Sequence, residues 1–144
     1  MDETLARKDA VTIHDSMDFD KSTFHRILTT RSWAQLKRTF EIYRTKYGAD
    51  FDRPQKNWYE KTVWAIHQFA MDSNVFFAIA LHRDLSHSST GYTYGASRVF
   101  TWRSEIDLGN IAKAHHRVYG QSLVHHIWKN VKGDARDTLL GILQ

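Results

Sequence analysis

The apolar residues of this chain recur at spacings of three and four, the period of an α-helix with one buried face. One such stripe consists of Trp33, Leu36, Phe40, Tyr43 and Tyr47. A second consists of Leu108, Ile111, His115 and Tyr119. The single proline and seven glycines leave few of the breaks that many short strands need. The pattern therefore predicts an all-α protein.

The chain resembles itself when it is displaced by 72 residues, half of its length of 144. Identical residues then meet at Arg26 and Arg98, Thr29 and Thr101, Arg31 and Arg103, Ser32 and Ser104, Leu36 and Leu108, Tyr47 and Tyr119, and Gly48 and Gly120. Self-similarity at a fixed period is the signature of a repeat architecture. We therefore predict two tandem copies, residues 1–72 and 73–144.

The matched residues include start and stop signals for one helix in each copy. Ser32 is followed three residues later by Gln35, the spacing of a capping box, and Ser104 is followed in the same way by Asp107. Glycine at a helix end adopts the left-handed conformation without steric cost. The matched glycines therefore predict where both helices end, at Gly48 and Gly120.

Five helices are predicted in each copy. The opening helices are expected near Glu3–Ile13 and Val75–Leu85, and short helices are expected over Thr23–Thr30 and Ala96–Trp102. The fourth position in the first copy is the weakest, because Pro54 leaves room for only a turn or two within 49–56. Asn57 with Glu60 is predicted to cap the last helix of the first copy, and Asp134 that of the second. The five tryptophans are interpreted first as core residues.

Several separated motifs, in order along nearly the whole chain, resemble the annexin family. Residues 24–32 (FHRILTTRS) resemble the second helix of an annexin third repeat, and Leu36–Phe40 with Tyr47-Gly48 continues that pattern. Residues 103–108 (RSEIDL), 119–123 (YGQSL) and 132–134 (KGD) are similar to a fourth repeat. The resemblance implies two tandem five-helix annexin-type repeats packed as one right-handed helical bundle domain. These correspond to the C-terminal pair of a four-repeat annexin.

The resemblance also implies a function, which is calcium-dependent binding to acidic phospholipid at membrane surfaces, without catalysis. In annexins a Gly-x-Gly-Thr loop between the first two helices of a repeat offers carbonyl oxygens to Ca²⁺. A carboxylate near the end of the fourth helix completes the shell. Calcium prefers six to eight oxygen ligands of this kind.

The second copy departs from this calcium pattern. Its loop keeps Thr90 and gains Gly91, but polar residues such as Ser88 replace the loop glycines. The distant carboxylate position falls on Asn130, which supplies one neutral oxygen in place of two charged ones. The weak calcium candidates of this copy are therefore Ser88, Thr90, Gly91 and Asn130.

The first copy departs further from the pattern. Its loop, residues 15–19, contains no glycine, and the carboxylate position falls at or near Pro54. Asp15 and Asp18 are its weak calcium candidates. We therefore expect calcium dependence to be weakened, with calcium as the only cofactor that the family implies.

Three residues of the second copy are candidates for contact with a membrane: Tyr92, Trp102 and Arg103. Trp102 stands where the other copy has Thr30, which favours partial exposure. The expected location is cytoplasmic and peripheral to the membrane. The alternative is a calcium-independent helical interaction module, whose partner is a second copy of the chain or other annexin-type repeats.

Charge and composition limit the possible partners and functions less than the motifs do. The net charge of +4 and pI of about 9.4 favour anionic partners, but the basic residues are dispersed, so a nucleic-acid partner is disfavoured. The chain has no cysteine, and it has no apolar run near the ~20 residues that a membrane span needs. No nucleophile and base occur at a recognised catalytic spacing, so an enzyme is not predicted.

Among the nine histidines, the pairs His115-His116 and His125-His126 form the best candidate metal cluster. Adjacent residues on a helix point about 100° apart, so at most one histidine of each pair can face a common ion. Packing and surface roles are the default interpretation of these histidines.

Overall fold

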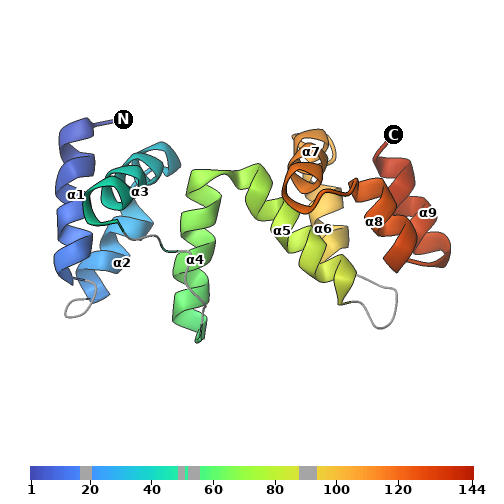
Figure 1. The fold of residues 1–144 in the computed structure, drawn as a ribbon, viewed down its shortest axis with the longest axis horizontal. Helices are drawn as coiled ribbons and strands as arrows, with labels where there is room; N and C mark the ends of the chain where they lie inside the picture. Colours follow the sequence, from blue (N-terminus) through green and yellow to red (C-terminus); the bar gives the residue numbers. More distant parts are fainter. Residues whose placement is uncertain (17–20, 49–50, 52–55, 88–93) are drawn as a thin grey trace. The chain divides into compact units, whose positions relative to one another are not determined.

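The computed structural model describes residues 1–16, 21–48, 51, 56–87 and 94–144. Every regular element in these residues is an α-helix, which confirms the predicted all-α class. Contacts divide the chain into two compact units, unit 1 (Met1–Met71) and unit 2 (Asp72–Gln144) (Figure 1). Of the helices in these ranges, none combines the length and the apolar character needed to cross a membrane.

The helices of unit 1 are α1 (Glu3–Ser16), α2 (Lys21–Thr30), α3 (Trp33–Tyr47) and α4 (Trp58–Met71). Helix α1 packs against both α2 and α3, and α4 packs against α3. The core consists of apolar side chains from these four helices, among them Ile13, Phe24, Ile27, Leu36 and Phe40. The segment where a short further helix was expected, 49–56, lies largely outside the described residues.

A buried ion pair connects the end of α2 to α1. The Arg31 guanidinium donates to both carboxylate oxygens of Asp9, with Nε–Oδ2 at 2.7 Å and Nη2–Oδ1 at 3.1 Å. Asp9 is almost completely buried. Because a buried carboxylate is costly without a partner, this bidentate pair fixes how the α2–α3 corner lies on α1. The same hydrogen bonds raise the pKa of Arg31.

Helix α3 begins and ends at the residues that the sequence predicted. Ser32 Oγ accepts a hydrogen bond from the Gln35 N–H, and Gly48 has a φ of 63°, with its N–H bonded to the Arg44 carbonyl. The capping box is only half formed, however. The Gln35 side chain instead contacts the backbone of Asp2, accepting from its N–H at 2.8 Å and donating to its carbonyl at 2.7 Å.

Unit 2 contains α5 (Ser73–Ser86), α6 (Tyr94–Arg103), α7 (Leu108–Tyr119), α8 (Leu123–Asn130) and α9 (Gly133–Ile142), the five helices expected for a repeat. Helix α5 contacts α6, α7 and α8, and α9 packs against α8 and α6. The fully buried core side chains of unit 2 include Leu81, Phe100, Ile111 and Ile127. Helix α5 contains the longest apolar run, residues 74–81, as expected.

The predicted start of α7 at Ser104 is wrong. Turns that continue from α6 occupy residues 104–107, and α7 begins at Leu108. Asp107 is the N-cap residue, but its carboxylate makes no capping hydrogen bond, because it is held by the Arg103 guanidinium. Gly120 ends the helix as predicted, with a φ of 68°. In this unit the ion pair with Arg103 therefore replaces the capping hydrogen bond that the Asp107 carboxylate could otherwise accept.

Two further predictions need correction. Helix α9 begins at Gly133 after an N-cap at Lys132, so Asp134 lies in the first turn and is not the cap. Most tryptophans are not core residues: Trp33, Trp58, Trp102 and Trp128 are all more than half exposed. The partial exposure expected for Trp102 is confirmed, at 70%. Asn57 and Glu60 do cap α4, through the Glu60 N–H donating to Asn57 Oδ1 at 2.9 Å.

The unequal roles of the two matched serines give a direct test. Replacing Ser32 by alanine removes a capping acceptor and should lower the free energy of unfolding by about 1 kcal/mol. The Ser104→Ala variant should stay within about 0.5 kcal/mol of the wild type, because Ser104 makes only a long, exposed hydrogen bond. Urea unfolding followed by circular dichroism measures both. Equal losses in the two variants would contradict the difference between α3 and α7.

Candidate functional site

Of the nine site residues predicted from the sequence, five lie outside the described part of the chain: Asp18, Ser88, Thr90, Gly91 and Tyr92. The other four are Asp15, Trp102, Arg103 and Asn130. Asp15 is exposed in the last turn of α1. The structure does not bring the other three together in one place.

Asn130 is the last residue of α8, at the end of unit 2 where α5 also ends. The preceding turn of α8 contains His126, whose Nε2 lies 3.1 Å from the hydroxyl of Ser86, the last residue of α5. The Asn130 amide nitrogen donates to the His126 carbonyl at 2.9 Å. Only the neutral amide oxygen of Asn130 is therefore offered to a cation.

The carboxylate closest in sequence before residues 88–93 is Asp84, and it has a structural role. Its Oδ2 accepts a hydrogen bond of 2.6 Å from the Ala96 N–H in the first turn of α6. A Cβ atom on Gly95 would lie 2.8 Å from this same oxygen, so glycine is needed for the close approach. A carboxylate in this position satisfies a free amide and interacts favourably with the helix dipole.

These donors are a poor fit to calcium. A Ca²⁺ site needs several oxygens, usually including a bidentate carboxylate. At this end of unit 2, Asn130 supplies one uncharged oxygen, and the nearby Asp84 is engaged by α6. Within the described residues, Asn130 and Asp84 therefore offer no free carboxylate at this end of unit 2.

The predicted membrane contacts Trp102 and Arg103 lie at the other end of α6. Trp102 is seven residues beyond Gly95, or about 10 Å along the helix, and it borders an open groove of about 340 Å³ between α5 and α6. The Arg103 guanidinium is bonded to Asp107 and lies 4.9 Å from the centre of the Phe77 ring. The hydrogen bonds to Asp107 raise the pKa of the Arg103 guanidinium. Arg103 is thus a paired cation, at the opposite end of α6 from Gly95.

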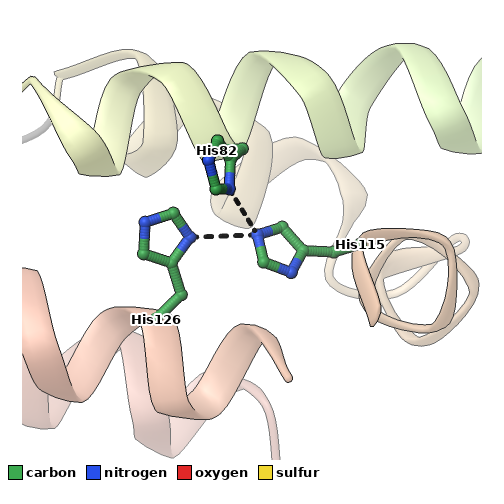
Figure 2. Close-up of side chains that lie close together, drawn as sticks. All are labelled: His82, His115 and His126. Atoms are coloured by element: carbon green, nitrogen blue, oxygen red, sulfur yellow. Dashed lines mark hydrogen bonds between the residues drawn. The ribbon is translucent and has the colours of Figure 1, made fainter. Parts of the chain in front are cut away.

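The most concentrated chemical group in unit 2 is a cluster of three histidines, His82 on α5, His115 on α7 and His126 on α8 (Figure 2). His115 Nε2 lies 3.0 Å from His126 Nδ1 and 3.3 Å from His82 Nδ1. One potential ligand atom from each ring lies within 4.8 Å of those from the other two. We call these residues the three-histidine cluster.

Burial keeps this cluster uncharged. His115 and His126 are 0% and 2% exposed, and His82 is half-buried. Loss of hydration lowers the pKa of all three imidazoles, and it is the largest cause for each. For His126, the charges of the neighbouring histidines and Lys129 add to the effect and bring the pKa to about 4. The cluster therefore presents neutral imidazole rings at neutral pH.

The sequence identified only part of this cluster. One histidine of each adjacent pair points inward and the other, His116 or His125, is exposed. This agrees with the expectation that adjacent residues on a helix point about 100° apart. The third member, His82, was missed because it is far away in the sequence, on the opening helix. A usable signal existed, since the opening helix of each copy carries a histidine near its C-terminal end, His14 and His82.

Sequence reasoning also missed an exposed cluster of basic and aromatic side chains in unit 1. Trp58 at the start of α4 is 83% exposed, and the Lys61 Nζ lies 5.0 Å from its ring centre. Lys21, the first residue of α2, is connected to the same place, because its Nζ lies 5.3 Å from the ring centre of Tyr59. Lys56 is exposed just before α4. Trp58, Lys21, Lys56 and Lys61 form what we call the Trp58 cluster.

Comparison with known proteins gives one family. The sequence model described as Annexin matches residues 8–53 and 96–142, one stretch in each unit. Annexin A3 of Rattus norvegicus is 34% identical over 150 residues, which cover 99% of this chain and 46% of that protein. Annexin A1 of Homo sapiens is 34% identical over 151 residues, covering 99% and 43%. A solved structure described as Annexin III superposes with a TM-score of 0.89 at 32% identity, covering 99% of this chain and 47% of that one.

These coverages are consistent with each other. The chain spans less than half the length of the curated relatives it matches. The similarity therefore concerns the fold and the family of these residues, and the activity of the whole relatives belongs to longer proteins.

The role assigned to Asp84 leads to a prediction about stability. The Asp84→Ala variant should lose about 1 kcal/mol of unfolding free energy, because the first turn of α6 loses its acceptor. The matched control is Glu105→Ala, which removes an exposed carboxylate from the turns after α6 and should change stability by less than about 0.5 kcal/mol. Urea unfolding with and without millimolar calcium measures both effects. A loss that appears only with calcium would contradict the structural role.

Proposed function

Because this chain belongs to the annexin family, we propose that it binds the surface of membranes rich in acidic phospholipid, as a peripheral protein on the cytoplasmic side and without catalysis. The observation that carries the proposal is the match of the Annexin model to both units. The family in general binds phospholipid in a calcium-dependent manner. The net charge of +4 supports an anionic surface as the partner.

We further propose that calcium dependence is weaker in this chain than the family pattern implies. A neutral amide at Asn130 replaces the carboxylate of that pattern, and its amide nitrogen is bonded to the helix backbone. Fewer charged oxygens lower calcium affinity. The residues at 88–91 and 15–18 are then weak ligands, and basic and aromatic side chains contribute a larger share of the binding.

The Trp58 cluster supports this mode of binding. Tryptophan is favoured at the boundary between headgroups and acyl chains, where its ring is partly buried and its N–H remains hydrated. Lysines close to an anionic leaflet contribute about 1 kcal/mol each. The carboxylate of neighbouring Glu60 accepts from the Lys56 N–H and the Asn57 side chain, so it is held at the start of α4. Trp58 and the three lysines thus provide a cationic, aromatic contact in unit 1.

A second candidate function is self-association through unit 2. Trp102 and Ile106 are 70% and 68% exposed, and Trp102 borders the groove between α5 and α6 with Phe76 and Phe77. Exposed apolar side chains next to a groove favour contact with another protein surface. Light scattering at tens of micromolar tests this candidate, and a monomeric mass would exclude it.

Vesicle sedimentation tests the membrane proposal and locates the contact. The chain should sediment with phosphatidylserine vesicles and stay in solution with phosphatidylcholine vesicles. Removing two lysines of the Trp58 cluster, in Lys56→Ala/Lys61→Ala, should lower the partition coefficient about 30-fold at low salt, because each lysine contributes about 1 kcal/mol. Raising the ionic strength should reduce this difference.

The matched control is Lys129→Ala/Lys132→Ala, which removes the same charge from exposed positions in unit 2. Its partition coefficient should fall much less than that of the first double variant. A larger loss in Trp102→Ala than in Trp58→Ala would instead move the contact to the end of α6. No sedimentation with phosphatidylserine, either with millimolar calcium or with chelator, would refute the membrane proposal.

A further inference from the structure

Three imidazole nitrogens from three different helices converge in unit 2. His115 Nε2 lies between His126 Nδ1, at 3.0 Å, and His82 Nδ1, at 3.3 Å (Figure 2). We propose that His82, His115 and His126 form a binding site for one transition-metal cation, and that Zn²⁺ is the ion this donor set fits best. The site is independent of membrane binding and of the calcium loops.

The spacing of the nitrogens is close to that of a tetrahedral zinc site. A Zn–N distance of 2.0–2.1 Å places neighbouring ligand nitrogens about 3.3 Å apart. The two shorter spacings already have this value within a few tenths of an ångström. The nitrogens of the remaining pair, His82 and His126, lie within 4.8 Å of each other, and His82, the half-buried member whose ring stacks on Tyr119, would move to close that distance.

Hydrogen bonds on the far side of two rings orient the nitrogens for a metal. His115 Nδ1 lies 3.1 Å from the Gln121 carbonyl, which only accepts, so Nδ1 carries the proton and Nε2 presents its lone pair to the centre. His126 Nε2 is 3.1 Å from the Ser86 hydroxyl oxygen, which can accept a hydrogen bond from an Nε2–H. In that tautomer the lone pair of His126 is on Nδ1. Such partners behind a ligand histidine fix its tautomer and strengthen the ligand.

Without a cation, one nitrogen, His115 Nε2, is the shared hydrogen-bond acceptor for two neighbouring imidazoles. Nε2 of His115 has a single lone pair, and two imidazole nitrogens, from His82 and His126, lie within hydrogen-bond distance of it. Only one of them can donate along that lone pair. A cation at the centre resolves the conflict, because each ring then directs one lone pair toward the metal.

Unit 1 shows that the fold does not need three histidines in this layer. His14 stacks on Tyr47 at 3.8 Å, as His82 stacks on Tyr119 at 3.6 Å. At the position that matches His115, unit 1 has Tyr43, whose ring centre lies 5.1 Å from that of Tyr47, the same distance as between His115 and Tyr119. Displacement by 72 residues places no histidine of unit 1 at the position of His126. The two buried histidines of unit 2 therefore have no counterpart at the matching positions of unit 1.

The chemistry of the cluster selects the class of ion. It contains no carboxylate, so it does not suit Ca²⁺ or Mg²⁺, which prefer oxygen ligands. Neutral imidazoles suit Zn²⁺ and its late first-row neighbours. Three histidines leave a fourth position for water.

Isothermal titration with ZnCl₂, in a non-chelating buffer and without vesicles, tests the site on the full chain. We expect one Zn²⁺ per chain at the site, insensitive to millimolar calcium, and intense visible bands when Co²⁺ is used instead. The variant His115→Tyr/His126→Phe places the ring of Tyr43 at position 115 and an apolar ring at position 126; it should fold, as judged by circular dichroism, but lose the site. Removing the Ser86 hydroxyl, in Ser86→Ala, should weaken Zn²⁺ binding about tenfold.

The matched control is His116→Ala/His125→Ala, which removes two exposed histidines adjacent to the cluster and should leave the affinity unchanged. A second ligand variant, His82→Ala, alters a half-buried residue and keeps the test valid if the double ring replacement does not fold. The proposal is overturned if the wild type shows no saturable site. It is equally overturned if the His82 variant binds as tightly as the wild type, or if the exposed pair accounts for the binding.

Discussion

A stacked pair of rings connects the first and third helices of each unit, and the packing around it follows from its position. His14 lies on Tyr47 and His82 lies on Tyr119, with ring planes within 8° of parallel. Each tyrosine is the last residue of its helix, directly before the left-handed glycine. The position at which the third helix ends therefore determines where along that helix the stacked pair lies. The rings that lie against it, that of Tyr43 in unit 1 and those of the two buried histidines in unit 2, are held at that level.

Much of this framework follows from the sequence. The glycines after both tyrosines, the cap at Ser32 and the apolar stripe of α3 are local signals, each effective through the backbone or through a period of three and four. The helical period also required that at most one histidine of each adjacent pair face inward, and it placed His115 on the apolar stripe. The family motifs added the expectation of calcium and phospholipid, which no local pattern in the chain would provide.

The rest depends on partners far apart in the sequence. Ser104 matches Ser32, yet α7 starts later, because Arg103 holds Asp107. Its counterpart Arg31 instead reaches a buried carboxylate on α1, Asp9. In unit 2 the Arg103 guanidinium lies over an aromatic ring, that of Phe77. The two matched arginines therefore have different partners, because α1 presents a carboxylate to Arg31 and α5 presents an aromatic ring to Arg103. His82 and Trp58 were missed for a similar reason, since exposure and convergence are properties of packed helices, and a one-dimensional pattern does not contain them.

The two copies have consequently kept one architecture while diverging in chemistry. At the position of Tyr43, unit 2 has the imidazole of His115, which keeps a flat side chain next to the stacked pair but introduces buried polar nitrogens that require partners. Gln121 and Ser86 satisfy two of those nitrogens from outside the cluster. The nitrogens on the inside have only one another, and the proposed cation would accept a lone pair from each of them. In unit 1 the corresponding layer is aromatic, and its distinctive chemistry lies at the surface, where lysines surround an exposed tryptophan.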